Sequence, residues 1–134
     1  MTIKTEDTPY IRFELKDGIL FAHYKPGVII TLELARKLLA KRLEFTENKP
    51  YPMLISDLGI VSVEKEAWTL LSSDEGTNKI TAGAMLLNTT YSRILGNFFF
   101  KLSAPKIPAK IFSDKQRALE WLEQYKKESA DTNG

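Results

Sequence analysis

Residues 53–71, MLISDLGIVSVEKEAWTLL, join a short apolar strand to an amphipathic helix through a polar turn. The run MLIS carries no charge and ends at Asp57, which is typical of a strand covered on both faces, as in a parallel sheet. The helix expected at residues 65–72 has an inward face made of Ala67, Trp68 and Leu71. A buried strand followed by a covering helix is the repeating unit of an α/β fold.

The same alternation extends on both sides of this unit. Further strands are expected at residues 10–15, 19–24, 82–87 and 109–112, and Lys16-Asp17-Gly18 forms a hairpin turn between the first two. Further helices are expected from Thr31 to Thr46, from a cap at Asn88, Thr89 or Thr90, and from a cap at Ser113 or Asp114. The order β-β-α-β-α-β-α-β-α predicts an α/β fold with a mixed, mostly parallel sheet of about five strands and about four helices.

Helical spacing also predicts which side chains share one face in each of two helices. In the helix from Thr31, the inward face is expected to hold Leu34, Leu38, Leu39 and Leu43, while the cations Arg36, Lys37, Lys41 and Arg42 lie largely elsewhere. In the helix after residue 88, Tyr91, Ile94, Leu95 and Phe98 fall at helical spacing and are expected to share one face. Residues 129–134 are expected to be a frayed tail.

Length and composition restrict the classes of protein to consider. The 134 residues fit one domain spanning 1–134, with its core at about 9–127. No apolar run approaches the ~20 residues of a membrane span, so the chain is expected not to be transmembrane. Cysteine is absent, which excludes disulfide and thiolate chemistry. The polar beginning lacks the features of a signal peptide and favours a cytoplasmic protein.

Charge is distributed unevenly along the chain. Residues 79–117 contain seven Lys and Arg and a single acid, Asp114, although the whole chain carries a formal charge of only +2. Such an asymmetry indicates either an anionic partner or a solvated face that keeps the protein soluble. A nucleic-acid partner is not expected, because the chain contains no reader motif and its pI of 8.8 is below the strongly basic range.

Two segments carry a family resemblance. Residues 54–71 combine a buried strand, an Asp-Leu end and an inward-facing helix, and residues 108–122, PAKIFSDKQRALEWL, repeat the pattern at the end of the chain. With the element order, they resemble the STAS domain, the SpoIIAA-like fold of bacterial anti-sigma-factor antagonists, and in particular the group labelled STAS/SEC14. The resemblance implies a non-catalytic regulatory or protein-interaction module. The STAS/SEC14 label implies, as an alternative, a carrier of a small lipophilic or anionic ligand.

The phosphorylation site of those antagonists has no counterpart here. The family carries a phosphorylatable Ser in an Asp-Ser-Ser-Gly-like run at the start of the helix after the third strand. The matching stretch in this chain is Glu64-Lys65-Glu66-Ala67, which has no hydroxyl, and Ser62 does not occupy the motif position. The resemblance therefore implies the fold without its Ser switch.

Candidate ligand-binding residues lie where strands should end. Ligands of open α/β sheets gather outside the carboxyl ends of the strands. Residues that could converge there are Ser56, Asp57, Ser62, Asn88 and Thr90. The alternative is that Asp57 and Ser62 only cap turns. An enzyme built around Asp57 is not expected, because no nucleophile, base and orienting group fall at suitable spacings.

The lone histidine, His23, is expected to have a structural role, because a metal site would require several ligands. It lies on the strand face shared with Ile19 and Phe21. No phosphate-binding glycine loop and no nucleophile elbow occur in the chain. We therefore expect no metal, no cofactor and no catalytic residue.

Three consecutive aromatic residues, Phe98, Phe99 and Phe100, cannot all face one stripe of a helix, since each residue turns it by about 100°. Either the loop 102–108 folds over these rings, or they form a surface for a protein partner, a homodimer or an anionic lipid. The predicted partner-binding residues are Tyr91, Phe98, Phe99, Phe100 and Lys101.

Overall fold

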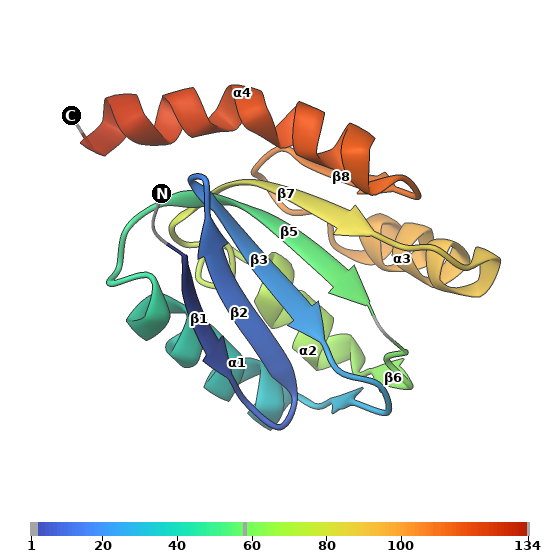
Figure 1. Ribbon diagram of the computed structural model, residues 1–134. Coiled ribbons are helices and arrows are strands. Elements are labelled where there is room, and N and C mark those ends of the chain that lie inside the picture. Colours follow the sequence, from blue (N-terminus) through green and yellow to red (C-terminus); the bar gives the residue numbers. More distant parts are fainter. Residues whose placement is uncertain (1–2, 58, 134) are drawn as a thin grey trace.

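A six-stranded sheet carries helices on both of its faces (Figure 1). The computed structural model describes residues 3–57 and 59–133, with the side chains of all of these except Asp57 and residues 127–133. The strands are β1 (Lys4–Asp7), β2 (Ile11–Lys16), β3 (Ile19–Tyr24), β4 (Ile29–Ile30), β5 (Tyr51–Asp57), β6 (Ser62–Val63), β7 (Ile80–Leu86) and β8 (Ala109–Phe112). The helices are α1 (Leu32–Phe45), α2 (Lys65–Ser72), α3 (Thr90–Leu102) and α4 (Lys115–Asn133).

The strand order in the sheet is β1-β2-β3-β5-β7-β8. Strands β1, β2 and β3 are antiparallel, whereas β3, β5, β7 and β8 run parallel to one another. Strands β4 and β6 form a separate parallel pair. The predicted α/β class with a mixed, mostly parallel sheet and four helices is thus confirmed.

The sheet has one strand more than the sequence predicted, because the polar segment Lys4–Asp7 pairs with β2 as an edge strand. Its side chains are held by polar contacts rather than by burial. Lys4 Nζ donates to the Phe45 carbonyl at 2.7 Å, Glu6 pairs with Lys41 at 3.2 Å, and Asp7 pairs with Lys25 at 2.7 Å. A charged edge strand of this kind gives no alternation of apolar and polar residues for sequence reasoning to detect.

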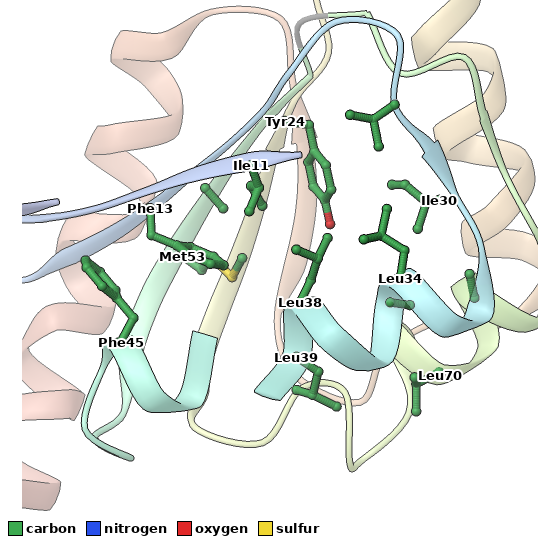
Figure 2. Packing of buried hydrophobic residues seen from close by; sticks show 14 of the residues in the cluster. Ile11, Phe13, Tyr24, Ile30, Leu34, Leu38, Leu39, Phe45, Met53 and Leu70 are labelled. Atoms are coloured by element: carbon green, nitrogen blue, oxygen red, sulfur yellow. The ribbon is translucent and has the colours of Figure 1, made fainter. Parts of the chain in front are cut away.

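Two hydrophobic cores lie on opposite faces of the sheet. Helices α1 and α2 cover a larger core that includes Phe13, Leu20 and Leu38, several of whose members are shown in Figure 2. Helix α4 covers a smaller core in which Ala84, Ala118 and Leu122 are each 0% exposed. Figure 1 shows α3 on the same side of the sheet as α1 and α2, with α4 on the other.

The expected helix caps are largely in place. Thr31 Oγ1 accepts from the Leu34 N–H at 3.1 Å, and Thr46 ends α1. Among the three candidates for α3, Thr89 is the cap, and it forms a capping box with Ser92. Asp114 accepts from the Gln116 N–H at 3.0 Å at the start of α4. The frayed tail expected at residues 129–134 is wrong for the backbone up to Asn133, which stays helical because α4 contains no glycine or proline.

Candidate functional site

An apolar cavity of about 340 Å³ lies between the sheet and helices α1, α2 and α3. Its floor includes Met53 of β5 and Met85 of β7, and its walls include Leu38 of α1, Leu71 of α2 and Leu95 of α3. Pockets that bind small molecules have volumes of about 300–1,000 Å³ and mostly apolar linings. The size and chemistry of this cavity therefore suit a small lipophilic molecule.

The floor of the cavity contains a glycine where a side chain would otherwise stand. Gly83 lies within β7 and lines the cavity, and a Cβ built on it has no other atom within 4 Å. A glycine inside a strand weakens the strand and often marks the close approach of a ligand or another backbone. Here it leaves open space above the middle of the sheet.

Helix α3 forms one wall of the cavity and is held at its carboxyl end by α2. The Trp68 indole donates to the Ser103 carbonyl at 3.0 Å, and its ring lies 5.7 Å from that of Phe99 and 5.5 Å from that of Phe100. Ser72 and Ser103 also share a hydroxyl–hydroxyl hydrogen bond of 2.9 Å. Gly96 is the only buried residue of α3. The helix is thus attached through a few residues rather than through a buried face.

The four residues expected to share one face of α3 lie in two different environments. Tyr91, Ile94 and Phe98 are 67%, 62% and 53% exposed, and only Leu95 turns toward the body. The physical reason is Gly96, whose missing side chain lets the helix approach Leu87 and Ile111. This contact directs residues 95, 96, 99 and 100 inward and leaves the opposite stripe in solvent.

The five predicted partner-binding residues fall on two sides of α3. Tyr91, Phe98 and Lys101 are exposed, whereas Phe99 and Phe100 are half-buried against Trp68. Ile94 and Leu102, which were not among the predicted partner-binding residues, complete the exposed stripe of Tyr91, Ile94, Phe98 and Leu102. We call this stripe the outer face of α3.

The predicted ligand-binding residues do not come together in one place. Ser62 and Asn88 are exposed and line the cavity, where they mark its mouth together with Val61 and Tyr91. Ser56 points to the opposite face of the sheet, and Thr90 is exposed at the start of α3 outside the cavity lining. The side chain of Asp57 lies outside the described residues. The mouth nevertheless lies beyond the carboxyl ends of β5 and β7, where ligands of such sheets gather.

Sequence reasoning missed two polar side chains that line the mostly apolar interior. Arg42 of α1 is 4% exposed, which corrects its expected place away from the inward face. It follows Leu38 by four residues and precedes Phe45 by three, so the helical spacing itself gave the signal. Tyr24 of β3 is the second residue, and Figure 2 shows its hydroxyl pointing toward α1 beside Leu34 and Leu38.

Burial dominates the acid–base properties of both groups. It lowers the pKa of Arg42 to about 10 and raises the pKa of Tyr24 to about 12. The charge of Arg42 acts on the Tyr24 hydroxyl and opposes the rise. At neutral pH, the cavity therefore presents a buried cation and a neutral hydroxyl.

A second polar group lies on the α4 face. His23 Nδ1 and Ser56 Oγ are 2.6 Å apart, and His23 Nε2 is 4.0 Å from a carboxylate oxygen of Glu14. Burial lowers the pKa of His23 below 6.5, which the Glu14 carboxylate partly opposes. Ser56 is 8% exposed and lies in a strand paired on both sides, with His23 opposite it on β3 and Leu86 on β7.

The stretch that replaces the phosphorylatable Ser has a structural role. Glu64 precedes α2, and its carboxylate accepts from the Leu32 N–H at 2.9 Å, at the first residue of α1. A carboxylate is favourable at a helix amino terminus, where backbone N–H groups lack partners. Glu64 thus links the starts of the two helices that cover the larger core.

Comparison with known proteins assigns the family. Residues 13–126 match the family model described as "Domain of unknown function (DUF7793)". The chain belongs to this family. No curated protein matches it.

Two solved structures are similar to this family member. One is an uncharacterized protein of the DUF3478 family with a SpoIIAA-like fold from Shewanella loihica PV-4, 17% identical, with 90% of this chain and 92% of that chain covered and a TM-score of 0.49. The other is a protein with unknown function from Arthrobacter sp. FB24, 23% identical over 81% of this chain and 88% of that chain, with a TM-score of 0.30. The sequence resemblance named the same SpoIIAA-like fold. The α/β assignment itself rests on the strand order and helix positions, because these TM-scores are low.

The described residues of this DUF7793 member form neither a cluster of metal ligands nor a membrane-spanning helix. Its described residues contain no group of three or more His, Asp or Glu side chains able to hold a metal ion. Within the same residues, no helix has the length and apolar character needed to cross a membrane.

Proposed function

We propose that the protein binds a small lipophilic ligand in the cavity under α1, α2 and α3, and that it acts as a carrier rather than as a catalyst. The observation that supports this most is the apolar cavity itself, about 340 Å³ in volume and lined by side chains from the sheet and three helices. Its mouth lies beyond the carboxyl ends of the parallel strands. The cytoplasmic location expected from the sequence is part of the same proposal.

A non-catalytic role is supported by the geometry around Ser56. His23 and Glu14 lie near this hydroxyl, an arrangement that superficially resembles a nucleophile with its base. The hydroxyl is nearly buried, however, and its strand is paired with neighbours on both sides. Acyl transfer requires free N–H donors close to the nucleophile to stabilise an oxyanion, and a central strand does not supply them. We therefore interpret the Ser56–His23 pair as structural.

Filling the cavity from its floor is expected to abolish binding without harming the fold. In Gly83→Leu, the new side chain enters open space, because a Cβ at this position meets nothing within 4 Å. We expect at least a ten-fold loss of affinity for dodecanol, measured by isothermal titration calorimetry. The melting temperature should stay the same or rise, since a strand glycine is replaced and a cavity is filled.

Gly83→Ala is the matched control, because a single methyl group occupies little of the cavity and should leave dodecanol binding nearly unchanged. Native mass spectrometry of freshly purified wild-type protein should also show a bound lipophilic molecule that is absent from Gly83→Leu. Failure of the wild-type protein to bind dodecanol or any co-purified molecule would contradict the carrier function.

The outer face of α3 favours a second function, protein interaction, which was the leading expectation from the sequence. Its exposed residues recur at helical spacing, and α3 carries Arg93 and Lys101 but no acidic residue. An apolar stripe flanked by cations suits a partner whose apolar groove has an acidic rim. A second copy of the chain fits less well, because a symmetric contact would bring the cations of both helices together.

This function is tested by a Tyr91→Ser/Phe98→Ser double variant, with Asn97→Ser on the same helix as the control. We expect the wild-type protein and both variants to be monomeric by light scattering. A captured partner, once purified, should bind the wild-type protein and Asn97→Ser in a salt-sensitive manner and bind the double variant at least ten-fold more weakly. A wild-type dimer that dissociates in the double variant would instead identify a second copy as the occupant. Unchanged partner binding by the double variant would exclude the outer face.

A further inference from the structure

The cavity contains a buried cation that the protein does not neutralise. Arg42 Nη2 donates to the Gly76 carbonyl at 3.2 Å, but Nη1 has no hydrogen-bond partner among the described residues. None of the ion pairs formed by the described side chains includes Arg42. Arg42 as a whole residue is nevertheless only 4% exposed.

Such an arrangement is costly without a partner for the charge. Removing a charge from water costs several kcal/mol even after the protein relaxes, and a buried donor without an acceptor adds to this cost. Most buried polar groups in proteins are hydrogen-bonded, so an exception calls for an explanation. Arg42 lines the cavity, and a ligand there is in a position to supply the missing acceptor.

The neighbouring group has matching chemistry. Tyr24 also lines the cavity, and its hydroxyl is close enough to Arg42 for the charge to act on its ionisation. With a pKa near 12, the hydroxyl stays protonated and remains able to donate a hydrogen bond. A guanidinium and a phenol together provide donors for the oxygens of one carboxylate, whereas most of the remaining lining is apolar.

We infer that the ligand is a single-chain amphiphile with a carboxylate head, of the fatty-acid class, and that Arg42 Nη1 binds the carboxylate. This inference rests on the proposed carrier function and names its ligand class. The apolar chain occupies the space above Gly83 and beside Leu71 and Leu95. Binding would satisfy the orphan N–H donors of Arg42 and compensate its charge.

The test compares dodecanoic acid with dodecanol, which have the same chain length but differ in the head group. Each is titrated calorimetrically into the delipidated wild-type protein, into Arg42→Met and into Gly83→Leu at neutral pH. The wild-type protein should prefer the acid at least ten-fold, because hydrogen bonds to a charged group are the strong ones. Arg42→Met should lose that preference and keep its affinity for dodecanol, while Gly83→Leu should bind neither compound.

The outcomes separate this inference from the proposed function. If the wild-type protein binds both compounds equally, the carboxylate assignment is wrong and the cavity function stands. If the wild-type protein binds neither dodecanoic acid nor dodecanol, both the carboxylate assignment and the proposed carrier function are wrong. Arg42→Met is expected to fold, because replacing an unpaired buried charge with an apolar side chain of similar length is often neutral or stabilising. The wild-type comparison decides the question even if this variant is unstable, and an acid preference retained in folded Arg42→Met would overturn the role of Arg42.

Discussion

Gly76→Ala is expected to destabilise the protein by about 3 kcal/mol or more, in the upper range for overpacking. A Cβ at this position would overlap the Leu70 carbonyl oxygen and lie 2.7 Å from the backbone of Leu71. Both contacts are to backbone atoms of α2, which cannot swing aside as a flexible side chain can. The turn would have to shift, and it would carry the Gly76 carbonyl away from Arg42. Chemical denaturation followed by circular dichroism measures the loss.

The control for this prediction is Gly83→Ala, which adds the same methyl group where nothing lies within 4 Å. It should leave the free energy of unfolding unchanged or raise it by up to about 1 kcal/mol, since alanine restricts the unfolded chain more than glycine does. Equal effects of the two substitutions would mean that the close approach of the turn to α2 is not required for folding.

Trp68→Ala is expected to cost about 3 kcal/mol of folding stability and to loosen α3. The substitution removes the hydrogen bond to the Ser103 carbonyl and the ring contacts with Phe99 and Phe100. Since Gly96 is the only other firmly buried point of the helix, little remains to hold its carboxyl end. Hydrogen exchange should become faster across residues 90–102, and dodecanol affinity should fall because one wall of the cavity is lost.

Trp121→Ala supplies a control of the same residue type on the α4 side of the sheet. Trp121 packs against Phe112 and Tyr125, away from the cavity. Its removal should also lower folding stability. The rate of hydrogen exchange in α3 should stay unchanged relative to the rest of the chain. Unaltered α3 exchange in Trp68→Ala would show that contacts other than this tryptophan position the helix.

Local patterns in the sequence predicted most of the architecture. The buried run at residues 53–56, the Asp17-Gly18 turn and the Thr31 cap each determine structure through interactions between near neighbours, so sequence reasoning located them. Strand β1 was missed because its own side chains are polar, and because Lys4 and Glu6 contact residues of α1, Phe45 and Lys41, that are distant in sequence.

The candidate site was less predictable because it depends on how elements meet. Phe98 and Phe99 are adjacent in sequence, yet one faces solvent and the other Trp68, and this difference arises from the approach of Gly96 to Leu87 and Ile111. Arg42 was placed on the wrong side of its helix because a cation is rarely buried. Only the packed structure shows that Arg42 is buried on the same helix face as Leu38, four residues earlier, despite its charge.

The alternation of β7 between two environments has a consequence for the evolution of the family. Ala82, Ala84 and Leu86 pack in the core under α4, whereas Gly83 and Met85 face the cavity. Under the proposed carrier function, selection for a folded domain and selection for a particular cargo would therefore act on alternate positions of one strand. Mutations at Gly83 and Met85 would then change the cargo, while Ala82, Ala84 and Leu86 preserve the architecture.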